Sequence, residues 1–196
     1  MSRSSAGGLP HHSFQAAMML TFYDLYGKLP APYESVLTKA YKHGRVTVAR
    51  NMSQAIADEI IGFDGAADAA AKVSGLRNIV GEVSRICREA AGAREFDRPF
   101  MMLRNIAAIE EKPMGICADA GWARLNNLDL CTSHCGKGCI RFFGFEPPSA
   151  TGFGVGYSVG PDGMQFSINN FSQAEANKFT AAIEARLLSL QALFSA

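Results

Sequence analysis

Apolar residues recur at helical spacing near both ends of the chain. Across residues 13–26 the run SFQAAMMLTFYDLY places its large apolar side chains three or four residues apart, which predicts a helix ended by Pro30 and Pro32. Near the other end, Ser172 and Glu175 have the spacing of a capping box at a helix start. The residues expected to line one face of this second helix are Phe179, Ile183, Leu187, Leu190 and Phe194.

The middle of the chain mixes helical and extended patterns. Residues 33–50 hold four Lys or Arg besides β-branched and aromatic residues, and we expect extended structure and turns there. In front of the last of the central helices, Asp97 is the expected N-cap, and Pro99 suits the first turn. The predicted central helices lie at about 52–62, 67–91 and 98–111.

Residues 114–170 differ in character, because they are rich in Gly, Cys and aromatic side chains. Two short apolar runs, 153–159 and 164–168, flank the sequence Gly160-Pro-Asp-Gly163. The Asp-Gly pair supplies the chemistry of a tight turn, so these runs predict a β-hairpin. With helices first, a small sheet next and a covering helix last, the pattern is typical of an α/β or α+β protein.

Composition excludes several functional classes. Hydrophobic residues make up 48% of the 196 residues and charged residues 19%, which is ordinary for a globular protein and too apolar for disorder. Lys and Arg number 19 against 18 Asp and Glu, so we expect no nucleic-acid partner. The longest apolar stretches, such as residues 14–22, are too short for a transmembrane span.

The five cysteines bear on the compartment. An odd number of cysteines favours an intracellular, reducing environment, without resolving mitochondrion, peroxisome or cytosol. The first twelve residues contain Arg and Ser and no acidic residue, which could mimic a transit peptide; we favour an irregular start to a fragment. The last three residues are not a Ser-Lys-Leu peroxisomal signal.

Several stretches, taken in order, resemble the choline/carnitine O-acyltransferase family. No single motif is specific, but their order and compatible spacing across nearly the whole chain support the resemblance. The matching stretches are Leu20-Thr-Phe-Tyr-Asp-Leu-Tyr-Gly27, Pro32-Tyr-Glu-Ser35, His43-Gly-Arg-Val-Thr-Val-Ala-Arg50, Phe96-Asp-Arg98, Leu130-Cys-Thr-Ser-His134, Phe142-Phe-Gly144 and Gly152-Phe-Gly-Val-Gly-Tyr157.

This resemblance implies one α/β lobe of the coenzyme A-dependent, chloramphenicol-acetyltransferase-like fold, with helices covering a small mixed sheet. It implies acyl transfer between coenzyme A and the hydroxyl of carnitine or choline, with acyl-CoA as co-substrate and no bound cofactor. We interpret residues 9–196 as the C-terminal lobe and residues 1–8 as an irregular start. The family's catalytic histidine lies upstream in a His-x-x-x-Asp setting. No such setting surrounds His11, His12, His43 or His134, so we expect little activity from the chain alone.

Three positions bear on the choice between carnitine and choline. The resemblance implies that Arg98 faces the carnitine carboxylate, which a guanidinium can bind with two parallel hydrogen bonds. Tyr33 matches a tyrosine that contacts the same carboxylate. Val46 is the choline-type residue where carnitine enzymes carry Thr, although Thr47 could substitute if the register shifted. We favour carnitine, because a buried carboxylate needs a counter-charge more than one extra hydroxyl. A surface Arg98 and a core Tyr33 are the structural alternatives.

Two further residues have roles implied by the family motifs. Ser133 ends the stretch that matches Ser-Thr-Ser, so it would stand on the oxyanion side of the acyl transfer centre. Cys131 replaces the first serine of that motif with a weaker donor, and His134 replaces a Gln, which puts a coenzyme A contact in doubt. Phe143 matches an aromatic residue near the trimethylammonium group, although a buried strand Phe would also explain it.

Two other classes of protein stay open. Cys131, His134, Cys135 and Cys139 cluster closely, but their spacing lacks the second, distant pair of a structural zinc site, and we expect no metal. A non-catalytic interaction domain is the other alternative. A split family domain would leave apolar surface uncovered, which could bind a missing N-terminal half or a partner chain.

Overall fold

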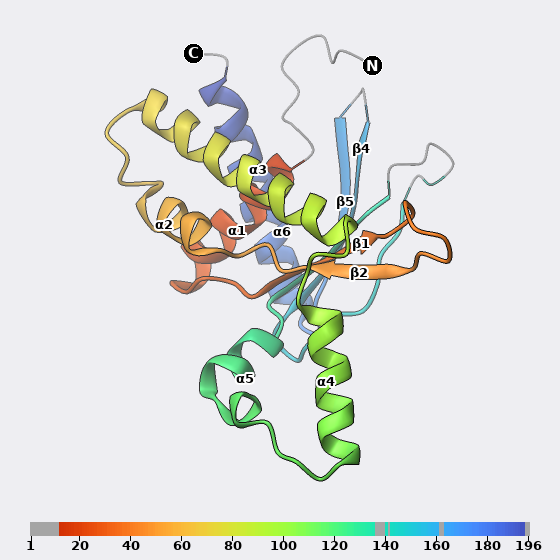
Figure 1. Cartoon of the computed structure of the whole chain (residues 1–196). Coiled ribbons are helices and arrows are strands. Elements are labelled where there is room, and N and C mark those ends of the chain that lie inside the picture. Colours follow the sequence, from red (N-terminus) through yellow and green to blue (C-terminus); the bar gives the residue numbers. More distant parts are fainter. Residues whose placement is uncertain (1–11, 136–139, 141, 161–162, 195–196) are drawn as a thin grey trace.

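A computed structural model describes residues 12–135, 140, 142–160 and 163–194. Within this part of the chain, helices pack on a five-stranded mixed sheet with the strand order β2-β1-β3-β4-β5 (Figure 1). The predicted α/β class with a small mixed sheet is confirmed. The strands are β1 (Pro32–Leu37), β2 (Val46–Ala49), β3 (Leu130–His134), β4 (Phe153–Gly160) and β5 (Gly163–Asn169).

The three central strands are parallel and the two edge strands are antiparallel to their neighbours. β1 pairs with β3 over only three residue pairs, whereas β3 pairs with β4 over five and β4 with β5 over seven. β2 runs antiparallel to β1 at one edge, with Leu37 opposite Val46. The β4–β5 hairpin has the predicted strands; residues 161–162 of its turn lie outside the described residues.

The helices lie in two groups. In Figure 1, α4 and α5 lie beyond the β2 edge of the sheet, away from the other helices. The helical elements are α1 (Ser13–Tyr26), α2 (Gln54–Gly62), α3 (Ala69–Ala91), α4 (Asp97–Ile109), the 3₁₀ turn η1 (Gly115–Ala118), α5 (Ala120–Asn126) and α6 (Gln173–Leu193).

The core lies between one face of the sheet and α1, α3 and α6. Residues 13–22 of α1 are all buried, so this helix is surrounded on every side rather than amphipathic. The Phe153 and Phe179 rings stack with centroids 4.3 Å apart, which joins β4 to α6. Phe14 contacts Tyr157 and Phe166 at 4.8 and 5.2 Å, which joins α1 to the hairpin. Together these aromatic contacts join α1, α6 and the β4–β5 hairpin around one core.

Two details of the predicted helices are wrong. Asp97 does not cap α4: Phe96 occupies the N-cap position, and the Glu95 carboxylate accepts hydrogen bonds from the backbone N–H groups of Asp97 and Arg98. At the end of α6, Phe194 is 41% exposed, whereas the other residues of its predicted face are buried or partly buried.

The capping box at the start of α6 forms only in part. Ser172 Oγ accepts from the Glu175 N–H at 3.4 Å, as predicted. The Glu175 carboxylate instead accepts from the Tyr26 hydroxyl at 2.7 Å, which ties α6 to the end of α1.

Candidate functional site

The two faces of the sheet differ sharply around β1 and β3. In register, Tyr33 lies opposite Cys131 and Glu34 opposite Thr132. Because side chains alternate along a strand, Tyr33, Cys131 and Ser133 share one face, here called the open face. Glu34 and Thr132 contact Gln15 of α1 on the other side, the covered face. The predicted residues Tyr33 and Ser133 thus lie on the same side of adjacent strands.

Tyr33 has two arginines, Arg50 and Arg98, and the carboxylate of Asp97 in its surroundings. The Arg50 guanidinium lies 5.5 Å from the Tyr33 ring centroid and is itself paired with Asp97 at 2.8 Å. Burial raises the pKa of the Tyr33 phenol, while the positive charge of Arg98 opposes that rise. The phenol is therefore protonated near neutral pH and can donate one hydrogen bond.

Arg98 lies in the first turn of α4, where Glu95 holds its backbone N–H at 3.2 Å. Its guanidinium reaches back to the edge strand, where Nη2 donates to the Val46 carbonyl at 3.4 Å. Within the described part of the chain Arg98 forms no ion pair, in contrast to Arg50. The structure therefore brings an uncompensated cation close enough to Tyr33 to influence its ionisation.

Phe143 lies in an irregular segment that crosses the open face. A Cβ at Gly156, which lies opposite Ser133, would meet the Phe143 carbonyl at 2.5 Å, so only glycine allows this close approach. The same carbonyl accepts from Ser167 Oγ of β5 at 2.7 Å. Phe143 is half-buried and is not a strand residue. The crossing segment therefore lies against the strand that neighbours Ser133.

Val46 and Thr47 point to opposite faces of β2. Val46 is 44% exposed and lies opposite Leu37, on the same side as Tyr33. Thr47 is buried and its hydroxyl donates to the Glu95 carboxylate at 2.5 Å. The residue available to the open face is therefore Val46, and Thr47 does not take its place.

The residues that flank Ser133 also differ in orientation. Cys131 shares the open face, and burial above all raises the pKa of its thiol to about 11, so the thiol stays protonated. His134 points to the covered face, where its ring centroid lies 5.1 Å from that of Tyr157. Burial lowers the pKa of His134. Cys131 and His134 both depart from the family pattern, but only Cys131 lies on the same face as Ser133.

Two features of the site were not predicted from the sequence: Arg50 lies beside Tyr33, and Glu34 is a buried carboxylate. Glu34 is only 5% exposed and accepts hydrogen bonds from Gln15, Thr132 and, at 3.2 Å, the Tyr157 hydroxyl. Burial raises the pKa of Glu34 to about 7. The only sequence signal for it was an acidic residue inside a predicted strand, which is unusual but does not specify partners.

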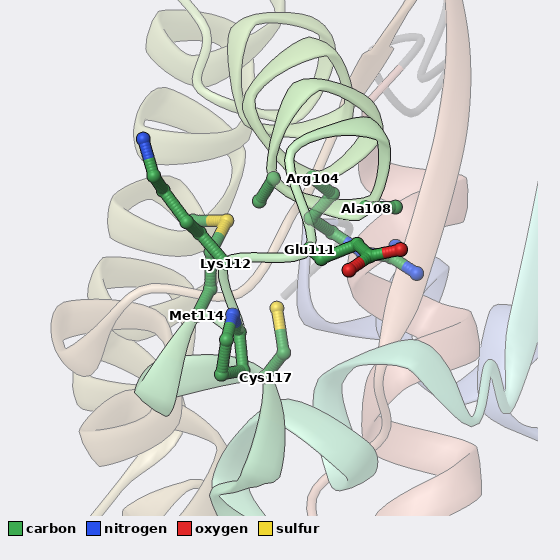
Figure 2. Close-up of a pocket in the computed structure, with 8 residues that line it drawn as sticks. Arg104, Ala108, Glu111, Lys112, Met114 and Cys117 are labelled. Atoms are coloured by element: carbon green, nitrogen blue, oxygen red, sulfur yellow. The ribbon is translucent and has the colours of Figure 1, made fainter.

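Two hollows lie outside the group formed by Tyr33, Arg98 and Ser133. One hollow of about 400 Å³ opens between α4 and η1 (Figure 2), and a second of about 390 Å³ borders Arg50 and Asp97. Neither is lined by any of these three residues. The first hollow is lined by Arg104, Ala107, Ala108, Glu111, Lys112, Pro113, Met114 and Cys117.

The described residues contain neither a cluster of metal ligands nor a helix fit to span a membrane. Among them, no three His, Cys, Asp or Glu side chains lie where they could hold a metal ion together. Cys139, one member of the alternative metal cluster, lies outside the described residues. None of the described helices is both long and apolar enough to cross a bilayer.

Comparison with known proteins identifies the family. The sequence model described as Choline/Carnitine o-acyltransferase matches residues 5–185, and the chain belongs to that family. Carnitine O-palmitoyltransferase 2, mitochondrial, of Xenopus tropicalis is 28% identical over 177 residues, covering 88% of this chain and 27% of that protein. The Bos taurus protein of the same name is 29% identical over 188 residues, covering 91% and 28%.

A second kind of relative is similar to a comparable degree. Carnitine O-acetyltransferase of Mus musculus is 27% identical over 195 residues, covering 94% of this chain and 30% of that protein. The chain therefore spans less than a third of the length of these relatives.

Proposed function

We propose that this chain supplies the alcohol-binding wall of an O-acyltransferase that moves an acyl group between coenzyme A and carnitine. The observation that carries the proposal is the uncompensated Arg98 guanidinium beside Tyr33. A fixed cation and a protonated phenol together match the carboxylate of carnitine. The relatives named for carnitine support this substrate.

Ser133 and Phe143 complete the proposed set. The Ser133 hydroxyl lies on the same face as Tyr33 and would donate to the oxyanion that develops on the acyl carbonyl. The face of an aromatic ring such as Phe143 attracts a quaternary ammonium group. Both carnitine and choline carry that group, so Phe143 does not distinguish between them.

Choline is the second candidate substrate, because Val46 rather than Thr47 faces the open side of β2. Choline has no carboxylate, so its binding would leave the Arg98 charge unpaired. An unpaired charge that is buried or half-buried, such as that of Arg98 with choline bound, is costly. With carnitine bound, Val46 in place of Thr loses only a single hydrogen bond. This difference favours carnitine.

The general base would come from a second domain. No histidine of this chain has the family's His-x-x-x-Asp setting, and general-base catalysis contributes about 10²–10⁴-fold to rate. We therefore propose that residues 9–196 form a lobe that is inactive alone. We place it in an intracellular, reducing compartment, which the odd number of cysteines favours and the relatives named as mitochondrial support.

Helix α4 offers the surface on which that second domain would dock. The helix has no buried residue, and Met102, Ile106 and Ile109 form one stripe along it with exposures of 54%, 47% and 81%. Arg98 lies in the first turn of the same helix, so a domain seated on the stripe would close over the anchor.

Docking is tested by co-purification with the region of the mouse acetyltransferase that this chain does not match. Ile106→Asp should abolish co-purification, because it places a charge in the apolar contact. The matched control is Ala108→Asp, which adds the same charge on another side of α4. Equal binding by wild type and Ile106→Asp would contradict this docking surface.

The substrate site is tested by nuclear magnetic resonance of the labelled chain. Titration with carnitine should shift the amide signals of Tyr33, Arg98 and Ser133, while choline should spare Arg98. Shifts confined to the hollow beside Cys117 would refute the assignment. Acetyl transfer from acetyl-CoA should be absent for the chain alone; transfer at a rate typical of an enzyme would refute the incomplete active site.

A further inference from the structure

The Glu34 carboxylate is buried without a counter-charge. Within the described part of the chain it forms no ion pair, and its partners are neutral donors from three elements. Gln15 comes from α1, Thr132 from β3 and Tyr157 from β4. A buried carboxylate is costly compared with an apolar side chain of similar volume, so core packing alone does not account for Glu34.

The position of Glu34 suggests what the network does. Glu34 follows Tyr33 in β1, and Thr132 precedes Ser133 in β3. The Thr132 hydroxyl donates to the Glu34 carboxylate, so the two strands are bonded through side chains on the covered face. Directly behind this bond, on the open face, lie the two residues proposed to bind substrate and oxyanion.

This bond matters because the backbone pairing there is short. β1 and β3 pair over three residue pairs only, and both strands are short. A slip by one residue would turn every side chain of β1 to the opposite face. With so few ladder hydrogen bonds, a side-chain link that fits only one alignment contributes strongly to register.

We propose that Glu34 is a positioning residue, which fixes the register of β1 against β3 and so holds Tyr33 and Ser133 side by side on the open face. What those two residues bind rests on the proposed function; the positioning itself does not. Glu34 touches no substrate in this account and acts only through Thr132 and its other donors.

The test compares Glu34→Leu, which removes the acceptor, with Val155→Ala as matched control. Val155 is fully buried on the covered face, lies opposite Thr132 on β4, and takes no part in the network. Native-state hydrogen exchange of the whole ligand-free chain is the first readout. In Glu34→Leu the Tyr33 and Ser133 amides should exchange at least about tenfold faster relative to those of β5, whereas Val155→Ala should show no such preference.

Two further variants keep the test decisive. Thr132→Val should reproduce the exchange pattern, and combining it with Glu34→Leu should add little, because both remove the bond between Thr132 and Glu34. If Glu34→Leu fails to fold, Glu34→Gln keeps the volume and one acceptor oxygen, and it should show a smaller change in the same amides. Exchange that rises equally in all strands for every network variant would overturn the proposal.

Carnitine affinity, measured where each variant is fully folded, separates the two proposals. Weaker binding by Glu34→Leu than by Val155→Ala supports positioning, with a difference of about tenfold or more expected. Equal binding by the two variants would refute positioning and leave the substrate assignment intact. A third outcome is that Glu34→Leu shows the selective exchange pattern but wild type does not bind carnitine. That outcome would support the positioning role of Glu34 and count against the proposed function.

Discussion

Replacing Glu34 with Gln should change how the stability of the protein depends on pH. The pKa of Glu34 is raised from 4.5 to about 7, chiefly by burial. Each pKa unit corresponds to about 1.4 kcal/mol, so ionising Glu34 in the folded state costs about 3 kcal/mol. Because the folded protein holds this proton more tightly than the unfolded chain, the resulting stability is complete below pH 4.5 and is lost as pH rises through 7.

Glu34→Gln stays neutral at every pH and therefore lacks this dependence. Urea unfolding of both proteins between about pH 4 and pH 8 gives the two free energies of unfolding. As the pH rises from about 4 to about 8, the free energy of unfolding of the variant should increase by about 3 kcal/mol relative to that of wild type. His12 and His134, whose pKa values burial lowers, titrate in both proteins, so their effects cancel in the difference.

The other ionisable groups that face Glu34 do not change this expectation. Tyr157 of β4, Cys87 of α3 and Cys131 of β3 all have raised pKa values, each mainly through burial and in part through the Glu34 charge. All three stay protonated throughout the range of the assay. The difference in the free energy of unfolding between variant and wild type could instead stay constant within about 0.5 kcal/mol from pH 4 to pH 8. That result would refute the buried carboxylate and its network.

Three further outcomes follow from packing, capping and burial. Phe179→Ala should lower the free energy of unfolding by about 3–5 kcal/mol, while Leu188→Ala, at a 68% exposed position, should change it by less than about 0.5 kcal/mol; similar effects would contradict the assigned core. Ser172→Ala should cost about 1 kcal/mol in the same urea assay, and no loss would contradict the α6 N-cap. The Cys131 thiol should react with iodoacetamide at pH 8 about 100-fold more slowly than free cysteine, measured by peptide mass spectrometry; a comparable rate would contradict its raised pKa.

Local elements were predictable from sequence because their signals are local. The helical spacing of residues 13–26 and the turn chemistry before Gly163 led to the observed α1 and hairpin strands. The predicted N-cap residue of α4, Asp97, was wrong because a second acidic residue, Glu95, lies close to it in sequence. The Glu95 carboxylate accepts from the free N–H groups at the helix start. Sequence spacing alone does not show which of the two carboxylates will accept hydrogen bonds from these N–H groups.

Long-range arrangement was predictable only through the family resemblance. Alternation along a strand indicates that Glu34 and Tyr33 face opposite sides, but the parallel pairing of β1 with β3 joins residues almost a hundred positions apart. No periodic signal specifies that register. For the same reason, neither the Thr132 bond to Glu34 nor the Arg50 contact with Tyr33 could be foreseen.

The proposal that Arg98 anchors a substrate carboxylate is tested most directly by calorimetric titration of the chain with carnitine and with choline. Arg98→Gln should weaken carnitine binding about 10- to 100-fold, since a charge-assisted hydrogen bond contributes about 1.5–3 kcal/mol, and should leave choline binding unchanged. Arg104→Gln is the matched control, because Arg104 lies on the same helix and contacts Trp122 at 5.8 Å instead. Carnitine binding that is equal in wild type and Arg98→Gln would contradict the account.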